Sequence, residues 1–198
     1  MTKPFQKIML YVGHHGIVRP RDIQAIGLPR EYLLRLCRQG KLVRSGRGIY
    51  TLPEAPITER HSYAEVAKRA PEAVFCLLSA LAFHEITTQS PASVWIALRQ
   101  GARKPAINSP SLRIVRLSGP SLTEGIENHK VEGVPVRVYS AAKTVADCFK
   151  FRNKIGLDVA IEALKDTVRQ KKASINEIYR CAKICRVSNV IRPYMEAL

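Results

Sequence analysis

The sequence predicts an α+β fold, in which a small helical unit with a hairpin precedes a larger region of mixed helices and strands. Apolar residues recur at helical spacing near the N-terminus, whereas VWIAL (94–98) and LRIVRLS (112–118) are typical of strands. The 198 residues, 46% of them hydrophobic, can form one large or two small domains with real cores. Global disorder is therefore excluded.

The first 50 residues predict three helices. Within residues 4–12 the apolar side chains recur at i, i+3, i+4 and i+7, which indicates an amphipathic helix. Pro20 suits the first turn of a second helix, which ends at Gly27. A third helix is expected over 29–39, because Pro29 suits its first turn and Gly40 follows its end.

A hairpin is expected next. KLVR (41–44) and GIYTL (48–52) predict two strands, and the residues between them include a glycine suited to a short loop. Three helices and a hairpin, in that order, are the elements of a winged helix-turn-helix. We therefore predict a winged helix-turn-helix domain over 1–55, a linker over 53–60 and a larger mixed α/β domain over 60–198.

The larger region mixes helical and extended patterns without internal repeats. Its expected helices are 62–70, 74–85, 141–151, 156–170 and 174–186, its expected strands are 94–98 and 112–118, a hairpin spans 125–140, and a short tail covers 190–198.

Charge is the strongest compositional signal. The chain carries 32 Lys and Arg against 16 Asp and Glu, a net charge of +16. Residues 1–55 hold ten of the basic side chains and only three acidic ones, so the charge density is higher there. A solubilising excess is one explanation, but such a field attracts polyanions, and nucleic acid is the commonest of these in a cell.

The cysteines and the apolar runs indicate the cellular compartment of the protein. The five cysteines form no CxxC pair and have no zinc-like histidine spacing, which favours reduced thiols. The run AVFCLLSALAF (73–83) is too short to cross a bilayer, and MTKPFQKIML lacks the apolar core of a signal peptide. We expect a cytoplasmic protein without a membrane partner.

The third helix is predicted to separate leucines from arginines. At about 100° per residue, Leu33 and Leu36 gather on one side with Leu34 at its edge, and basic side chains gather opposite. Arginine and glutamine can hydrogen-bond guanine and adenine edges, and a wing holds arginines against phosphates. The alternative is a solvated basic helix beside an ordinary hairpin or a protein-binding winged helix. The predicted DNA contacts are Arg30, Arg35, Arg38 and Gln39 on the helix, Arg44 and Arg47 on the wing, and Arg19 and Arg21 before the second helix.

No catalytic pattern stands out in the larger region. His84-Glu85 lacks the second histidine of a zinc-protease motif. Lys143 and Asp147 lie four apart, which fits an acid with an activating lysine, but a surface ion pair is far more common at this spacing. We predict no enzyme activity, catalytic residue, metal or cofactor. A basic loop at Arg99, Arg103 and Lys104 is either a second phosphate-contacting patch or simply solvated.

Three segments carry a family resemblance. RPRDIQAIGLPREYLLRLCRQGKLVRSGRGIYTLPE (19–54), LLSALAFHEITTQSPASVWIAL (77–98) and VYSAAKTVADCFKFRNKIGLDVAIEAL (138–164) resemble AbiEi-type antitoxins of type IV toxin–antitoxin and phage-defence systems. The resemblance covers about residues 5 to 170. It implies a winged helix that binds inverted repeats in its own promoter and represses the operon, and a C-terminal antitoxin domain.

The resemblance also implies a partner. The antitoxin domain would counteract a nucleotidyltransferase-like toxin, indirectly and without a stable complex. The DNA-contacting positions transfer from the family motif for Arg30, Arg35, Arg38, Gln39, Arg44 and Arg47. Two alternatives remain open: a stand-alone winged-helix regulator without a toxin partner, and a nucleic-acid-modifying enzyme targeted by the winged helix.

Overall fold

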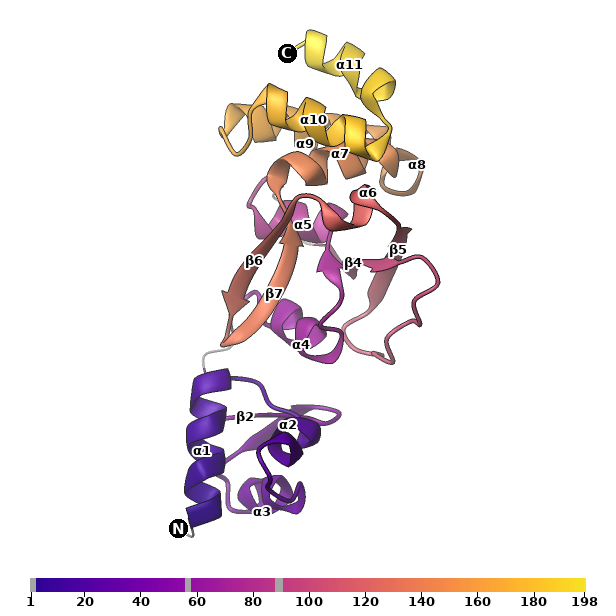
Figure 1. The fold of residues 1–198 in the computed structure, drawn as a ribbon. Helices are drawn as coiled ribbons and strands as arrows, with labels where there is room; N and C mark the ends of the chain where they lie inside the picture. The colour runs from indigo at the N-terminus through magenta and orange to yellow at the C-terminus, as the bar shows by residue number, and fades with distance from the viewer. Residues whose placement is uncertain (1–2, 56–57, 88–90) are drawn as a thin grey trace. The chain divides into compact units, whose positions relative to one another are not determined.

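The computed structural model describes residues 3–55, 58–87 and 91–198 (Figure 1). Contacts between residues divide the chain into two compact units. Unit 1 comprises Met1–Pro71 together with Lys130–Val136, and unit 2 comprises Glu72–His129 with Arg137–Leu198.

Unit 1 begins with the predicted order of elements. Three helices are followed by an antiparallel two-stranded hairpin, and one further helix closes the segment. The elements are α1 (Lys3–His15), α2 (Pro20–Ala25), α3 (Glu31–Arg38), β1 (Val43–Gly46), β2 (Ile49–Thr51) and α4 (His61–Arg69).

The core of unit 1 is built from the apolar faces of its first three helices. Ile8, Ile23, Leu33 and Leu36 are completely buried and belong to one hydrophobic cluster. An isolated bridge between Val18 and Tyr50 ties the segment before α2 to the hairpin. The amphipathic spacing that predicted the helices thus also builds the core beneath α3.

The last turn of α4 contacts α2 and the hairpin. The Lys68 ammonium lies 3.0 Å from a carboxylate oxygen of Asp22 on α2. Arg69 pairs with Glu65 at 2.9 Å and donates to the backbone carbonyl of Arg47 at 3.4 Å. By these contacts α4 is part of unit 1. The linker predicted over 53–60 and the domains predicted over 1–55 and 60–198 stay predictions.

Most of a five-stranded sheet in the order β5-β4-β3-β7-β6 belongs to unit 2, and the residues where β6 ends and β7 begins are counted with unit 1. Strand β3 pairs antiparallel with β4 and parallel with β7, and β4 pairs parallel with β5. Strand β5 is therefore an edge of the sheet. The strands are β3 (Val74–Phe75), β4 (Val94–Arg99), β5 (Leu112–Leu117), β6 (Ile126–Val131) and β7 (Val134–Tyr139).

Helix α7 forms the centre of the helical part of unit 2. Every residue of Ala141–Phe149 is buried, and α7 packs against α5, α9 and α10 (Figure 1). Ser140 caps its first turn by accepting a hydrogen bond from the Lys143 amide. The helices are α5 (Leu77–Phe83), α6 (Pro120–Thr123), α7 (Ala141–Lys150), α8 (Arg152–Ile155), α9 (Leu157–Arg169), α10 (Ile175–Cys185) and α11 (Ser188–Glu196).

The predicted α+β class is confirmed, with local differences. The single helix expected over 74–85 is divided into β3 and α5, because Val74 and Phe75 pair with β4 and Leu77 then takes a positive φ of 48°. The tail expected over 190–198 is mostly helical in α11. Residues 56–57 of the linker and 88–90 of the SALAFHEITTQSP block lie outside the described residues.

Candidate nucleic-acid interface

Helix α3 presents a buried face and an exposed face. Leu33 and Leu36 are completely buried, as their spacing predicts. The exposed side holds a stripe at i, i+3, i+4 and i+7: Glu31, Leu34, Arg35 and Arg38. Leu34 was expected at the edge of the apolar side, yet it is 49% exposed. Leu34 therefore lies on the exposed side of α3, away from the buried Leu33 and Leu36.

The charged groups around α3 differ in how they are held. The Arg35 guanidinium lies 5.7 Å from the centroid of the Tyr32 ring, which itself meets Phe5 edge-to-face at 5.2 Å. The aromatic pair therefore restricts Arg35 before any ligand arrives. Arg30 lies 3.3 Å from Glu31 in an exposed ion pair, so part of its charge is neutralised.

The remaining helix positions are open to solvent. Arg38 and Gln39 are both exposed at the C-terminal end of α3. Their side chains are available to a groove or a backbone that lies along the helix.

The hairpin positions its two arginines at the turn. Arg44 is exposed and its Nε donates to the carbonyl of Gly46 at 3.2 Å. Arg47 is also exposed, and its own carbonyl accepts from Arg69. A side chain at Gly46 would come within 2.7 Å of the Glu65 carboxylate, so the hairpin lies close against α4. Helix α4 thus packs against the hairpin, which the sequence alone did not predict.

The two arginines that the sequence placed before the second helix differ: Arg19 directly precedes α2, whereas Arg21 lies in its first turn. Arg21 is exposed. The Arg19 side chain is only 16% exposed and its guanidinium lies 3.5 Å from Asp22. Burial lowers the pKa of Arg19, and the Asp22 carboxylate opposes that change. Arg19 therefore also serves to hold the start of α2.

A second group of cations lies at the β4–β5 edge of unit 2. Arg99, Arg103 and Lys104, expected from the sequence, are all exposed. The Arg116 guanidinium donates to the carbonyls of Arg99, at 3.2 Å, and Ala102, which pins the loop after β4.

The cations of this edge take part in none of the salt bridges found among the described residues. Arg113 on β5 is exposed and lies 6.0 Å from the Trp95 ring centroid. The sequence has no Asp or Glu between Glu85 and Glu124. The five cations of the edge are Arg99, Arg103, Lys104, Arg113 and Arg116. Arg113 and Arg116 were missed because strand pairing, not sequence proximity, brings them to the loop.

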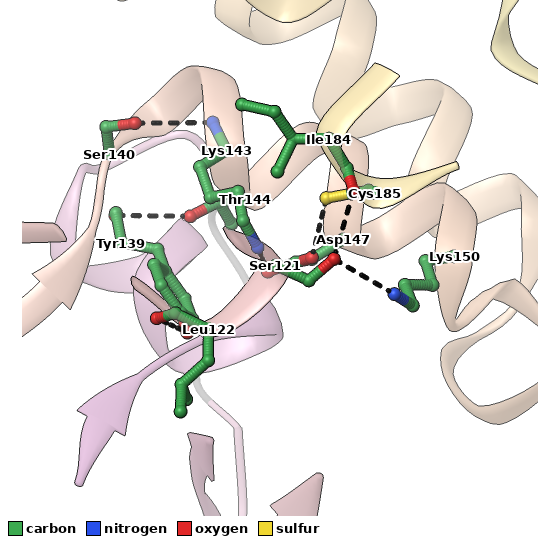
Figure 2. A network of polar contacts seen from close by, with 10 residues as sticks. All are labelled: Ser121, Leu122, Tyr139, Ser140, Lys143, Thr144, Asp147, Lys150, Ile184 and Cys185. Atoms are coloured by element: carbon green, nitrogen blue, oxygen red, sulfur yellow. Dashed lines mark hydrogen bonds and ion pairs between the residues drawn. The ribbon is translucent and has the colours of Figure 1, made fainter. Parts of the chain in front are cut away.

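Lys143 and Asp147 do form the ion pair that their spacing predicted, but not at the surface. Their side chains are 0% and 1% exposed, and the charged atoms lie 2.6 Å apart. The Cys185 thiol donates to the other Asp147 oxygen at 3.3 Å (Figure 2). Burial raises the pKa of Asp147, an effect that the Lys143 ammonium opposes. The Lys143–Asp147 pair lies within α7, and the hydrogen bond from Cys185 joins it to α10 inside the core, which makes the pair a structural contact.

Tyr139 extends this network toward α6. Its hydroxyl donates to the Leu122 carbonyl at 2.8 Å, and the Lys143 ammonium lies 4.2 Å from its ring centroid (Figure 2). The Thr144 hydroxyl donates to the Tyr139 carbonyl at 3.2 Å. The buried polar atoms of α7 thus have partners within unit 2.

Within residues 3–55, 58–87 and 91–198, no three His, Cys, Asp or Glu side chains cluster in a way that could hold a metal ion. Over the same residues, none of the helices combines the length and the apolar character needed to span a bilayer.

Comparison with known proteins agrees with the geometry of unit 1. Residues 6–53 match the family model of the AbiEi antitoxin, described as a transcriptional regulator. Among curated proteins, no sequence matches the chain. The fold is similar to the crystal structure of the RV2827C protein from Mycobacterium tuberculosis, with a TM-score of 0.62 and 13% identity over 98% of this chain and 78% of the other. The segment that forms α1, α2, α3 and the hairpin is therefore similar in sequence to the AbiEi antitoxin, as its motifs predicted.

Proposed function

We propose that this protein is a DNA-binding transcriptional regulator that inserts α3 into a major groove. The proposal rests on one observation above all. Arg35 and Arg38 are exposed on the helix whose opposite leucines form the core, within the segment that matches a regulator family. In helix-turn-helix proteins the corresponding helix packs on the first two and turns its other face to the bases.

The other exposed cations of unit 1 are proposed to position the duplex. Arg44 and Arg47 on the hairpin would contact backbone or minor groove, and Arg21 would contact a phosphate. Arg30 and Gln39 lie at the two ends of α3 and would contact the groove rim. The partly buried Arg19 would hold α2 in place beneath them.

The cations of unit 2 are proposed to contribute phosphate contacts of their own. Arg99, Arg103 and Lys104, together with Arg113 and Arg116, offer five exposed charges on the β4–β5 pair and the loop after β4. Such contacts raise affinity without reading sequence.

The regulator is further proposed to act as an autorepressor and antitoxin in the cytoplasm. It would bind inverted repeats in its own promoter and counteract a nucleotidyltransferase-like toxin indirectly, as in a type IV toxin–antitoxin system of phage defence. The description of the matched family, an antitoxin that is a transcriptional regulator, supports this extension. The antitoxin activity is assigned to residues 60–198 and the DNA-binding activity to residues 1–55.

Binding to the DNA upstream of its own gene tests the regulatory proposal. Arg35→Ala with Arg38→Ala should weaken specific binding by at least tenfold, because a good base contact contributes roughly 1–3 kcal/mol. Arg169→Ala with Lys171→Ala removes the same charge at the end of α9 and serves as the matched control. Unchanged specific affinity in the α3 variant, with its helicity preserved, would refute the assignment of α3.

Co-expression with the neighbouring gene tests the antitoxin proposal. If that gene encodes a nucleotidyltransferase-like toxin, the full chain should restore growth. The Arg35 and Arg38 double variant should still restore growth when both genes are expressed from foreign promoters, because neutralisation is assigned to the other domain. Growth arrest despite full expression of the wild-type chain would leave a stand-alone regulator as the better description.

A further inference from the structure

Leu34 is an apolar side chain in the middle of a charged surface. It is 49% exposed, while Leu33 and Leu36 on the same helix are completely buried. At about 100° per residue it lies on one side of the line from Glu31 to Arg38, and Arg35 lies on the other side. The exposed stripe of α3 therefore offers two kinds of contact side by side, one cationic and one apolar.

The chemistry of the major groove limits what such a leucine can meet. Base edges there present hydrogen-bond donors and acceptors, and the 5-methyl group of thymine is their apolar group. Leu34 is the fourth residue of α3, and the N-terminal residues of a recognition helix are those that reach base edges. An adjacent arginine would hydrogen-bond a neighbouring base while the leucine covers the methyl group.

We propose that Leu34 is a specificity-determining residue that reads a thymine through its 5-methyl group. The inference rests on the proposed function, because it assumes that α3 lies in a major groove. It adds a residue that the sequence analysis placed at the edge of the core. It also predicts that the bound sequence contains a thymine whose methyl group, not its hydrogen bonds, is recognised.

Replacement of thymine by deoxyuridine tests this directly, since it removes the methyl group and leaves base pairing intact. The probe is the duplex that the full-length chain enriches from a library of randomised sequence. Each of its thymines is replaced in turn, and the dissociation constant is measured by fluorescence anisotropy. At the contacted thymine the affinity should fall about fourfold, the equivalent of the ~0.8 kcal/mol gained by burying one methyl-sized group.

The Leu34→Ala variant supplies the second arm of the experiment. It should bind the thymine duplex at least about fourfold more weakly than wild type and should no longer distinguish thymine from deoxyuridine. Alanine is a good helix former, so α3 should persist. Leu10→Ala is the matched control, because Leu10 is 67% exposed on α1 and lies outside the stripe. This control should keep both the affinity and the thymine preference of wild type.

Three results would overturn the inference, and they point to different causes. If no deoxyuridine replacement weakens binding, α3 reads bases without a methyl contact. If Leu34→Ala weakens binding equally for thymine and deoxyuridine duplexes, the leucine acts elsewhere, for example between two copies of the chain. If the full chain enriches no sequence at all, the proposed regulatory function fails together with the inference.

Discussion

The ammonium group of Lys68 on α4 lies 3.0 Å from a carboxylate oxygen of Asp22 on α2. Both side chains are only 14% exposed. Asp22 also accepts a hydrogen bond from the Arg19 backbone amide at 2.9 Å. One carboxylate therefore holds the start of α2 and contacts α4, which ties α2 to a residue 46 positions later in the sequence.

Asp22→Ala is expected to destabilise unit 1 by about 1–3 kcal/mol, because it leaves partly buried cations without their acceptor. Glu196→Ala is the control, since its ion pair with Arg192 is 63–70% exposed and is screened by solvent, so its loss should change stability little. Hydrogen exchange of the Leu28 amide, which donates to the Ile23 carbonyl at 3.1 Å, reports the opening of this region. Equal exchange in both variants would show that the Asp22–Lys68 pair does not stabilise unit 1.

Two carboxylates make unit 1 sensitive to acid. Burial tends to raise the pKa of Asp22, but the bonds from Lys68 and Arg19 lower it overall. Burial also tends to raise the pKa of Glu132. The hydrogen bonds that Thr58 donates to its carboxylate, and His61 at 2.7 Å, lower this pKa overall. A lowered pKa contributes stability that is fully present above the unfolded value of about 4 and is lost as the pH falls through the folded value.

Unit 1 is therefore expected to lose hydrogen-exchange protection when the pH is lowered below about 4. Asp22→Asn should flatten this dependence while lowering stability at neutral pH, because the neutral amide cannot gain or lose the proton. An unchanged pH profile in Asp22→Asn would assign the acid sensitivity to other groups.

Any side chain at Gly16 is expected to lower the stability of unit 1. It has a φ of 63°, and a Cβ there would lie within van der Waals overlap of the Glu132 backbone carbonyl. Gly27 has a φ of 77° but open space around it, so Gly27→Ala carries only the left-handed strain of about 1–2 kcal/mol. Gly16→Ala should cost about 1–3 kcal/mol more than Gly27→Ala in thermal unfolding. Equal costs would mean that the loop at Glu132 moves away freely.

Local patterns in the sequence were sufficient for most helices and for the buried face of α3. The leucine spacing of α3 gave the buried side correctly, because helix periodicity depends on neighbours along the chain. The exposure of Leu34 was missed, since a wheel cannot tell how far the core extends around a helix. The burial of Lys143 with Asp147 was missed for a related reason. Spacing predicts that the two charges meet, but the helices that cover them come from distant segments.

The buried Lys143–Asp147 pair predicts an asymmetric response to mutation. Asp147→Ala should destabilise unit 2 by about 3–5 kcal/mol, because it leaves the Lys143 ammonium unpaired in the core. Lys143→Met with Asp147→Leu removes both charges and should cost less. Asp166→Ala breaks an ion pair whose arginine is 75% exposed and should cost less than about 1 kcal/mol.

Trp95 provides the readout for these variants. It is the single tryptophan of the chain and lies in the same hydrophobic cluster as α7, so its fluorescence follows unfolding of unit 2 in urea. If the double variant were as unstable as Asp147→Ala, the loss would come from packing and not from the unpaired charge.

The five cations at the β4–β5 edge predict a change in the salt dependence of DNA binding. Each phosphate contact contributes about −0.9 to the slope of log affinity against log salt. The triple variant Arg99→Ala, Arg103→Ala, Lys104→Ala should therefore reduce the magnitude of the slope by roughly 2–3 if all three contact phosphates. Its preference among DNA sequences should stay the same, because phosphate contacts carry no base information.

The matched control for this edge replaces Arg169, Lys171 and Lys172 by alanine. It removes the same net charge from unit 2 at the end of α9, where cations suit the helix dipole. The control should leave the slope close to that of wild type, since charge alone acts weakly beyond a Debye length of about 8 Å at physiological salt. If both triple variants reduced the slope equally, the β4–β5 edge would act through its net charge. Its cations would then not contact phosphates individually.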